Sequence, residues 1–433
     1  DNYISENEDM PQWYPNLFSG MPSYGGYIYM NGDPTKIFRN SILFNLGLKI
    51  WFFLSLGGFG TFFLLKVLGY SSNAGVLGGL ITGLTPYSFG LVNAGHLNKI
   101  FAMAYVPWVI ACFLLFMKRK SIKSLCVLSL VTALQLWSNH PQIVYYTWMI
   151  IGFNYIWNIV SEYKNQSLSL KTIASQTGGI LVSLLAAFLI VSDPYKEVYT
   201  FQKHSNRGAK SVLDKTNETS SGTDWQYATQ WSFHPKELIS FVYPYFYGLQ
   251  NFSSRDLKSA AYWGYMPFTQ STHYFGLIVL ILASIGALLK KPDRTSLFFW
   301  ITSALILITG FGSYFPILYR PFFEVFPFFS KFRIPSMIYA MLPVIISILA
   351  ARGFDSLASF KDKKQTFLKV LYVAGGIAIL SLILLIISDS LIDFNSTRDS
   401  GYNAYIKTQL KSLRYDLFNK GLILALVLSA SFL

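Results

Sequence analysis

The feature that most constrains the fold of this chain is a series of long apolar runs. A helix needs roughly 18 to 20 mostly apolar residues to cross the hydrocarbon core of a bilayer. Only 13% of the 433 residues are charged, against about 25% in soluble domains. The sequence therefore predicts an all-α, polytopic transmembrane helix bundle of about 11 apolar segments. They lie near residues 41–68, 75–94, 101–117, 122–138, 142–160, 173–192, 273–289, 296–312, 334–351, 367–387 and from 421 onward.

Basic residues collect in alternate connections between these runs, which indicates the orientation of the bundle. Cytoplasmic loops of membrane proteins carry an excess of Lys and Arg. The connections after the third, fifth, seventh and ninth runs hold Lys118, Arg119, Lys120, Lys123, Lys164, Lys171, Lys290, Lys291, Arg294, Arg352, Lys361, Lys363 and Lys364. The sequence therefore predicts a multi-pass membrane protein whose basic loops face the cytoplasm. Its loops at 1–40, 94–100, 138–142, 193–272, 313–333 and 388–419 would face the extracytoplasmic side.

This pattern divides the chain into four parts. Residues 1–40 form a first extracytoplasmic loop, acidic and aromatic, and residues 41–192 an N-terminal transmembrane bundle. Residues 193–272 form a long extracytoplasmic loop region, and 273–433 the C-terminal transmembrane helices. The chain starts without Met and ends inside an apolar run, so we expect it to be a piece of a longer protein. Pro86 and nearby glycines predict a kinked or partly re-entrant second run.

The net charge of +14 does not indicate a nucleic-acid partner, because the positive residues fall largely in short loops between apolar runs. Cys112 and Cys126 lie inside apolar runs and are expected to be small apolar residues rather than a disulfide or metal ligands. The sequence has no P-loop, Rossmann glycine pattern or GxSxG motif. Their absence argues against a nucleotide-driven pump or a cytosolic nucleotide-sugar enzyme, but not against a lipid-linked donor.

Two pairs of cations lie in loops expected on the extracytoplasmic side. In "NAGHLNKIFAMAYVPW", His96 and Lys99 are three residues apart and face the same way on a helix. In "SKFRIP", Lys331 and Arg333 precede an apolar run. Such cations suit a phosphate near the headgroup plane. The alternatives are snorkelling of Lys99 with His96 as a cap, and ordinary interfacial anchoring of Lys331 and Arg333.

An acidic stretch opens the chain in "SENEDMPQWYPNLFSGMP". Glu6, Glu8 and Asp9 are candidate general bases that would activate an acceptor hydroxyl, and Trp13 is a candidate substrate contact. The alternative is a solvated acidic loop.

Further candidate substrate contacts lie in two later motifs. "SNHPQIVYY" holds Asn139, His140 and Gln142, where Asn139 and Pro141 also suit the start of a helix. The long loop holds Trp231 and Glu237 in "QYATQWSFHPKE", which predicts either a sugar platform or a lid on the membrane surface. The His234–Glu237 spacing is unlike that of zinc sites. We expect no metal or other cofactor, with a divalent ion left open.

Several motifs together resemble the YfhO-like family of bacterial polytopic membrane proteins, relatives of the GT-C class of glycosyltransferases. They are "WYPNLFSGMPSY", "AGHLNKIFAMAYVPW", "NHPQIVYY", "YATQWSFHPKE", "YWGYMPFT", "KFRIPSM" and "ARGFD", between residues 13 and 355. The likeness is greatest to the versions found in Bacteroidetes. It implies a GT-C-like bundle with an acidic base in the first external loop. Glu6, Glu8 and Asp9 match that stretch, and an acidic residue ahead of residue 1 is the alternative.

The resemblance implies a membrane glycosyltransferase that moves a sugar from a polyprenyl-phosphate donor to an envelope polymer or lipid acceptor on the extracytoplasmic face. Two other functions stay open. One is a non-catalytic membrane subunit of a secretion or envelope complex. The other is a lipid-linked sugar transporter, which the scarcity of ionisable residues in the middle of the apolar runs disfavours.

Overall fold

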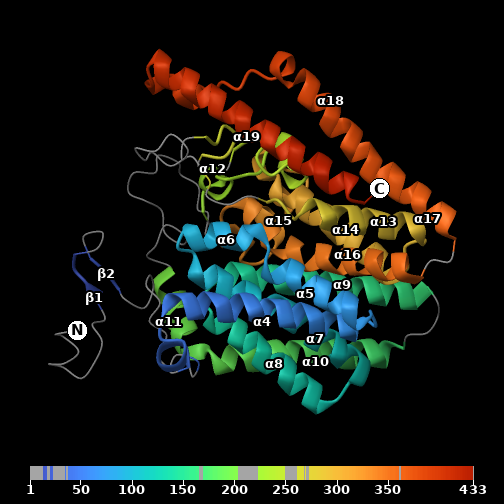
Figure 1. The fold of residues 1–433 in the computed structure, drawn as a ribbon. Coiled ribbons are helices and arrows are strands. Elements are labelled where there is room, and N and C mark those ends of the chain that lie inside the picture. Colours follow the sequence, from blue (N-terminus) through green and yellow to red (C-terminus); the bar gives the residue numbers. More distant parts are fainter. Residues whose placement is uncertain are drawn as a thin grey trace.

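The computed structural model describes residues 13–16, 20–22, 35, 38–164, 169–202, 223–248, 261–267, 269, 273–359 and 362–432. The regular secondary structure within them is helical, apart from one antiparallel ladder of β1 (Trp13–Tyr14) and β2 (Met21–Pro22). The predicted all-α class is therefore confirmed. The ladder stands apart from the helical body in Figure 1.

The first half of the bundle contains η1 (Phe38–Ile42), α4 (Leu46–Val67), α5 (Ser72–Gly83), α6 (Pro86–Asn93), α7 (Leu97–Arg119), α8 (Ile122–Trp137), α9 (Pro141–Lys164), α10 (Leu170–Ile190) and α11 (Ser192–Gln202). The kink expected in the second run is confirmed at Pro86, which takes the first position of α6. Proline fits there because it has no N–H to donate back into a preceding turn.

The second half contains α12 (Trp225–Ala228), η2 (Pro235–Phe241), α13 (Leu277–Leu289), α14 (Arg294–Gly310), η4 (Gly312–Tyr314), α15 (Tyr319–Val325), η5 (Phe329–Lys331), η6 (Pro335–Met341), α16 (Leu342–Ser359), α17 (Lys363–Val370), η7 (Leu371–Gly375), α18 (Gly376–Leu391), η8 (Thr397–Gly401) and α19 (Ala404–Ala430). The region expected as a loop at 193–272 thus includes α11, α12 and η2.

Seven helices of the described chain are long and apolar enough to cross a membrane, so the predicted number of about 11 apolar segments is not confirmed. The seven helices are Leu46–Val67, Ser72–Asn93, Leu97–Arg119, Pro141–Glu162, Leu170–Ile190, Pro335–Ser359 and Lys363–Ser390. Three shorter apolar helices, α8, α13 and α14, accompany them. At 1.5 Å per residue, the 13 residues of α13 extend only about 20 Å.

The boundary of the last run differs from the prediction. Residues 404–419, expected within a loop at 388–419, form the first part of α19, which continues without a break to Ala430. In Figure 1, α18 and α19 lie next to each other on the outside of the bundle.

Small residues allow the first helices to pack with their backbones close together. A Cβ atom placed on Gly58 of α4 would lie 2.9 Å from the carbonyl oxygen of Gly79 in α5. On the neighbouring side of α4, Gly57 faces Ala104 of α7, and the Trp108 indole donates a hydrogen bond to the Leu56 carbonyl at 2.9 Å. Close approach at glycine and alanine is the usual way in which membrane helices gain contact area.

Helix α16 lies at the centre of the molecule, between α13 and α14 on one side and α5 on the other (Figure 1). The span Pro335–Ser359 that ends with it is 89% buried over its most apolar window. A hydrogen bond of 2.9 Å between Thr82 and Ser347 joins α16 to α5. The core of the bundle is therefore built around this helix.

The loops sort to two opposite ends of the bundle. At one end Asp355 accepts hydrogen bonds from Ser71, and Arg294 donates to Asn158. At the other end Gln142 donates to the Arg333 carbonyl, and the Phe233 N–H donates to the Gly310 carbonyl. The two groups match the loops that the basic residues predict for the two faces. Which end faces the cytoplasm stays a prediction.

Candidate functional site: a basic hollow

A hollow of about 460 Å³ opens where the N-terminal ends of α4, α7 and α9 meet. It is lined by Arg39, Asn40, Leu46, Lys49, Gly95, His96, Leu97, Asn98, Lys99, Phe101, Trp137, Ser138, Asn139 and His140. We call it the basic hollow. It brings together four predicted site residues from two separate motifs: His96, Lys99, Asn139 and His140.

Lys99 is the most unusual residue of the basic hollow. Its side chain is only 8% exposed, and no described carboxylate lies within ion-pair distance. It sits in the first turn of α7, where the helix dipole favours negative rather than positive charge. Burying an ammonium group in such a place is unfavourable unless a ligand supplies the negative charge. The arrangement therefore suits an anion.

Backbone groups add to this preference. The helix α7 begins at Leu97 without a side-chain cap, and α9 begins at Pro141 immediately after His140. The free N–H groups of a helix N-terminus are a ready binding site for phosphate or carboxylate. The N-terminus of α7 thus lines the hollow, and α9 begins next to it. At α9, Pro141 has no N–H, and the Ile143 and Val144 N–H groups donate to the His140 carbonyl.

His96 lies at the start of α7 with its side chain exposed. Partial burial and the nearby positive charge of Lys99 lower the pKa of His96 below its ordinary value. The imidazole is therefore mostly neutral at pH 7, and it can donate or accept a single hydrogen bond beside the Lys99 charge.

The structure adds Arg39 and Lys49 to the site, two residues that sequence reasoning did not single out. The Lys49 ammonium donates to the Asn40 side chain at 3.3 Å. None of the described residues that line the hollow is acidic. The sequence held a signal for both residues. They are cations near the predicted extracytoplasmic face, where the positive-inside rule predicts few Lys and Arg.

Lys331, Arg333 and Gln142 lie outside the lining of the basic hollow. The buried Gln142 side chain donates to the Arg333 carbonyl at 2.7 Å and to the Tyr146 hydroxyl at 2.8 Å. The Arg333 guanidinium donates a hydrogen bond to the Tyr227 hydroxyl, and its central carbon lies 5.0 Å from the centre of the Tyr227 ring. Gln142 therefore fixes the loop before η6 against α9, next to the hollow. Lys331 lies at the end of η5, in the same loop.

Glu237 also lies away from the hollow. Its buried carboxylate accepts hydrogen bonds from the Tyr262 hydroxyl at 3.0 Å and from the Tyr265 N–H at 2.7 Å. Burial raises the pKa of Glu237, and these donors and Arg398 oppose the rise. The contacts hold the segment 262–266 against η2.

The remaining predicted residues are spread over other parts of the chain. Trp231 is half-buried in a turn after α12, and Trp13 is exposed on β1. Glu6, Glu8 and Asp9 lie outside the described residues. Within the described residues, no group of three or more His, Cys, Asp and Glu is placed to hold a metal ion.

A further residue missed by sequence reasoning, His273, lies within the electrostatic reach of Lys99. Its ring stacks on Tyr87 at 5.0 Å and packs edge-on against Phe233 and Tyr339. Burial, with a smaller contribution from the positive charge of Lys99, lowers the pKa of His273 to about 3. This histidine is therefore neutral at pH 7 and adds no charge near Lys99.

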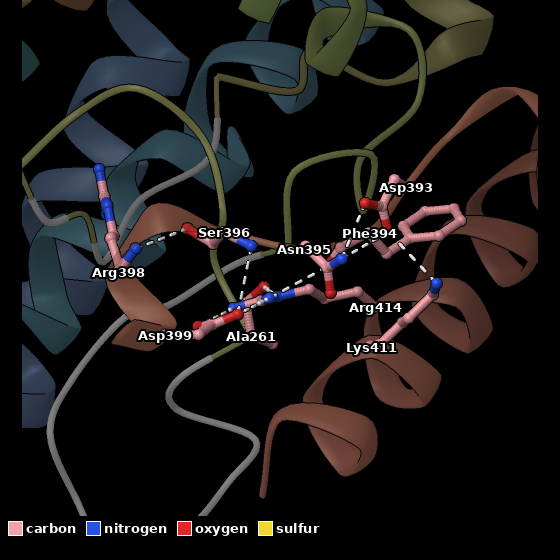
Figure 2. A network of polar contacts seen from close by, with 9 residues as sticks. All are labelled: Ala261, Asp393, Phe394, Asn395, Ser396, Arg398, Asp399, Lys411 and Arg414. Carbon is pink, nitrogen blue, oxygen red and sulfur yellow. Dashed lines mark hydrogen bonds and ion pairs between the residues drawn. The ribbon is translucent and has the colours of Figure 1, made fainter. Parts of the chain in front are cut away.

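Figure 2 shows a second polar cluster, in which Arg414 of α19 is held by the loop before it. The guanidinium is 1% exposed and donates to both carboxylate oxygens of Asp399, at 2.6 and 2.9 Å, and to the Phe394 and Ala261 carbonyls. All these acceptors belong to the protein itself. We therefore regard the cluster as structural and the basic hollow as the candidate site.

Protein-family models, curated proteins and solved structures were compared with the chain, and none of them matches it.

Proposed function

We propose that the protein is a GT-C-type membrane glycosyltransferase that takes a sugar from a polyprenyl-phosphate donor and passes it to an envelope acceptor. One observation carries the proposal: the buried Lys99 shares a hollow with other cations and with the N-terminus of α7, and no described lining residue is acidic. Such a site favours a phosphate group. The glycosyltransferase class itself rests on the resemblance of the motifs.

A second cavity supports a lipid-linked substrate. It has a volume of about 460 Å³ and is lined almost wholly by apolar side chains of α9, α14 and α15, among them Trp148, Phe153, Ile306 and Phe322. It begins at Tyr145, less than two turns along α9 from His140 of the basic hollow. We call it the α9–α14 groove. It suits a polyprenyl chain whose phosphate lies in the hollow.

The residues then take the following roles. Lys99, Arg39 and Lys49 would bind the phosphate and stabilise the negative charge that grows on it as the sugar leaves. His96, Asn139 and His140 would donate hydrogen bonds to the phosphate or the sugar. Glu6, Glu8 or Asp9 would remove the proton of the acceptor hydroxyl as that oxygen attacks the anomeric carbon.

Binding and transfer by the purified full-length protein test the proposal. Lys99→Met should weaken the binding of a polyprenyl phosphate by roughly 10- to 100-fold, the usual value of a hydrogen bond to a charged group. The same change should raise the melting temperature of the ligand-free protein, because a buried unpaired charge is removed. Lys171→Met, on exposed surface at the opposite end, is the control.

Filling the α9–α14 groove tests the position of the chain. A Cβ on Gly152, which lines the groove, would meet no atom within 4 Å, so Gly152→Leu should place its side chain in the groove without a clash. Gly178→Leu on α10 has the same free space and lies outside the groove. The first variant should bind the polyprenyl phosphate more weakly, and the second should bind it like the wild type.

A sugar-transfer assay with a panel of radiolabelled polyprenyl-phosphate sugars distinguishes a glycosyltransferase from a non-catalytic subunit or a transporter. Transfer that is lost in Lys99→Met identifies a glycosyltransferase. Binding without transfer for every donor would reject the enzyme. In that case, co-purification with a defined membrane complex would favour a structural subunit, and movement of the lipid-linked sugar across vesicles would favour a transporter.

A further inference from the structure

Two adjoining cavities lie at the end of the bundle opposite the basic hollow. The first, of about 200 Å³, is enclosed by α7, α9 and α14, and the second, of about 300 Å³, by α7, α9 and α10. Leu114 and Asn158 line both. We call the first the inner cavity and the second the rim cavity.

The inner cavity is largely apolar. Its wall includes Ile110, Phe113, Ile150, Phe298 and Phe299. Aliphatic and aromatic side chains around a space of this kind favour a hydrocarbon chain over water or a free ion.

Positive charge surrounds the opening. Lys118 and Lys120, at the end of α7, line the rim cavity, and Arg294, at the start of α14, lines the inner cavity. Glu162 is the one acidic residue among the described residues of the two linings, and its carboxylate lies 4.0 Å from Arg294. The local charge is therefore net positive.

Two buried donors of the inner cavity have no acceptor among the described residues: the Trp157 indole N–H and the Arg294 Nε–H. The Nη2 of Arg294 is occupied, since it donates to the side chain and the carbonyl of Asn158 at 2.8 and 3.0 Å. A buried donor without an acceptor costs free energy. Both atoms are buried, so the acceptor oxygens of a ligand would reach them only after these side chains shift.

We propose that the two cavities bind an anionic phospholipid, with its phosphate against Lys118, Lys120 and Arg294 and the first part of one acyl chain in the inner cavity. The adjoining apolar space favours a lipid over a free phosphate ion. The position also fits, because this end is the one expected in the cytoplasm, whose leaflet holds anionic lipids that basic pockets between membrane helices bind. The site is separate from the proposed transfer reaction.

Native mass spectrometry of the delipidated full-length protein tests the site. Dioleoyl phosphatidylglycerol and dioleoyl phosphatidylcholine would be added in equal amounts, with inorganic phosphate as a third arm. The wild type should prefer the anionic lipid by about fivefold or more, from the usual gain of each added cation. Lys118→Gln/Lys120→Asn should lose this preference. Asn suits position 120 because the backbone φ there is 50°.

Lys123→Gln/Lys171→Gln is the charge-matched control, because both lysines are exposed near this end and line neither cavity. The control should keep the preference. Equal loss in both double variants would show a general surface-charge effect and overturn the proposal. Displacement of the lipid by millimolar inorganic phosphate would also overturn it, because the site would then bind an anion alone.

A third variant tests the acyl chain. Leu114→Trp should narrow the passage between the cavities and weaken phosphatidylglycerol binding several-fold. Trp157→Phe, which removes the indole donor and part of the ring, should weaken it less and keep the fold. Full binding by both variants would place the lipid elsewhere. None of these readouts depends on sugar transfer, so failure here leaves the proposed enzyme untouched.

Discussion

At the scale of single residues, buried charge separates structural roles from functional ones. Arg414 and Lys99 are both buried cations, but Arg414 has Asp399 beside it, whereas no described carboxylate is beside Lys99. Burying a charge is unfavourable unless something compensates it. Arg414 is compensated inside the fold. For Lys99 the compensation is expected from a ligand, which is why we place the site there.

Breaking the Arg414–Asp399 pair should destabilise the protein strongly. Arg414→Met leaves a buried carboxylate without its partner, and we expect the free energy of unfolding to fall by about 3 kcal/mol or more. Chemical denaturation in detergent would measure it. Lys411 lies in the same helix as Arg414 and forms an exposed ion pair with Asp393 (Figure 2). Lys411→Met should therefore change stability little. Equal effects of the two variants would contradict a structural role for Arg414.

The buried His273 should make the folded protein less stable at acidic pH. Its pKa is near 6.5 in the unfolded chain and about 3 in the folded protein. Below pH 6.5 the unfolded state therefore binds a proton that the folded state does not, and stability falls with pH. The loss is about 1.4 kcal/mol per unit, or about 2 kcal/mol from pH 6.5 to 5. His273→Phe should flatten this acid limb in melting curves taken across that range. Parallel curves for the two proteins would refute the prediction.

Part of the site can be predicted at this scale. His96, Lys99, Asn139 and His140 were candidates because polar residues are conspicuous at the mouths of apolar hairpins. Their meeting in one hollow was not predictable, because it depends on how α7 and α9 pack. Glu237 and Gln142 were expected to contact substrate, and the structure places both in contacts within the protein. Their roles toward a substrate stay predictions.

At the scale of helices, close backbone contacts hold the centre together. A Cβ on Gly353 of α16 would run into the Leu282 carbonyl of α13, and one on Gly286 would lie 2.8 Å from Gly353. The apolar runs predicted these helices, because long apolar periodicity is a strong local signal. The start of α19 was mispredicted, because the charges of Lys411 and Arg414 look like those of a loop when their partners, Asp393 and Asp399, are distant in sequence.

Gly353→Ala should separate α13 from α16. The added methyl group cannot be accommodated without moving backbone, so we expect a loss of about 2 kcal/mol or more in the free energy of unfolding. Gly178→Ala on α10 meets open space and should be neutral or stabilising by up to about 1 kcal/mol. Denaturation of the two variants side by side measures the difference. A similar stability for both would show that the α13–α16 contact is looser than the structure indicates.

At the scale of the whole molecule, the polar and charged groups lie toward the two ends of the bundle. The basic hollow and the Arg414 cluster lie toward one end, and Lys118, Lys290 and Lys363 lie toward the other. Basic residues predicted this sorting from the sequence alone. The number of spans was less predictable, because α8, α13 and α14 are apolar but shorter than the other candidate spans. Composition alone does not separate such helices from full-length spans.

Cysteine labelling would test the orientation. Cys112 and Cys126 would be replaced by Ala, and single cysteines placed at Lys123, Lys171, Glu324 and Tyr405, which are exposed in the structure. A membrane-impermeant maleimide added to intact spheroplasts should label positions 324 and 405 and leave 123 and 171 unlabelled until the membrane is opened. The reverse pattern would put the basic hollow in the cytoplasm and exclude the proposed face of reaction.

The glycine contacts also decide where the molecule can move. The backbones are in close contact at Gly58 and Gly79, which join α4 to α5, and at Gly286 and Gly353, which join α13 to α16. We expect little relative movement within each of these two pairs. The α9–α14 groove lies along part of the boundary between α9 and α14. Toward the other end, Arg294 of α14 donates to Asn158 of α9. Under the proposed function, a long lipid chain would enter this groove sideways from the bilayer. The pairs α4–α5 and α13–α16 would then act as a fixed frame, and α9 and α14 as the gate.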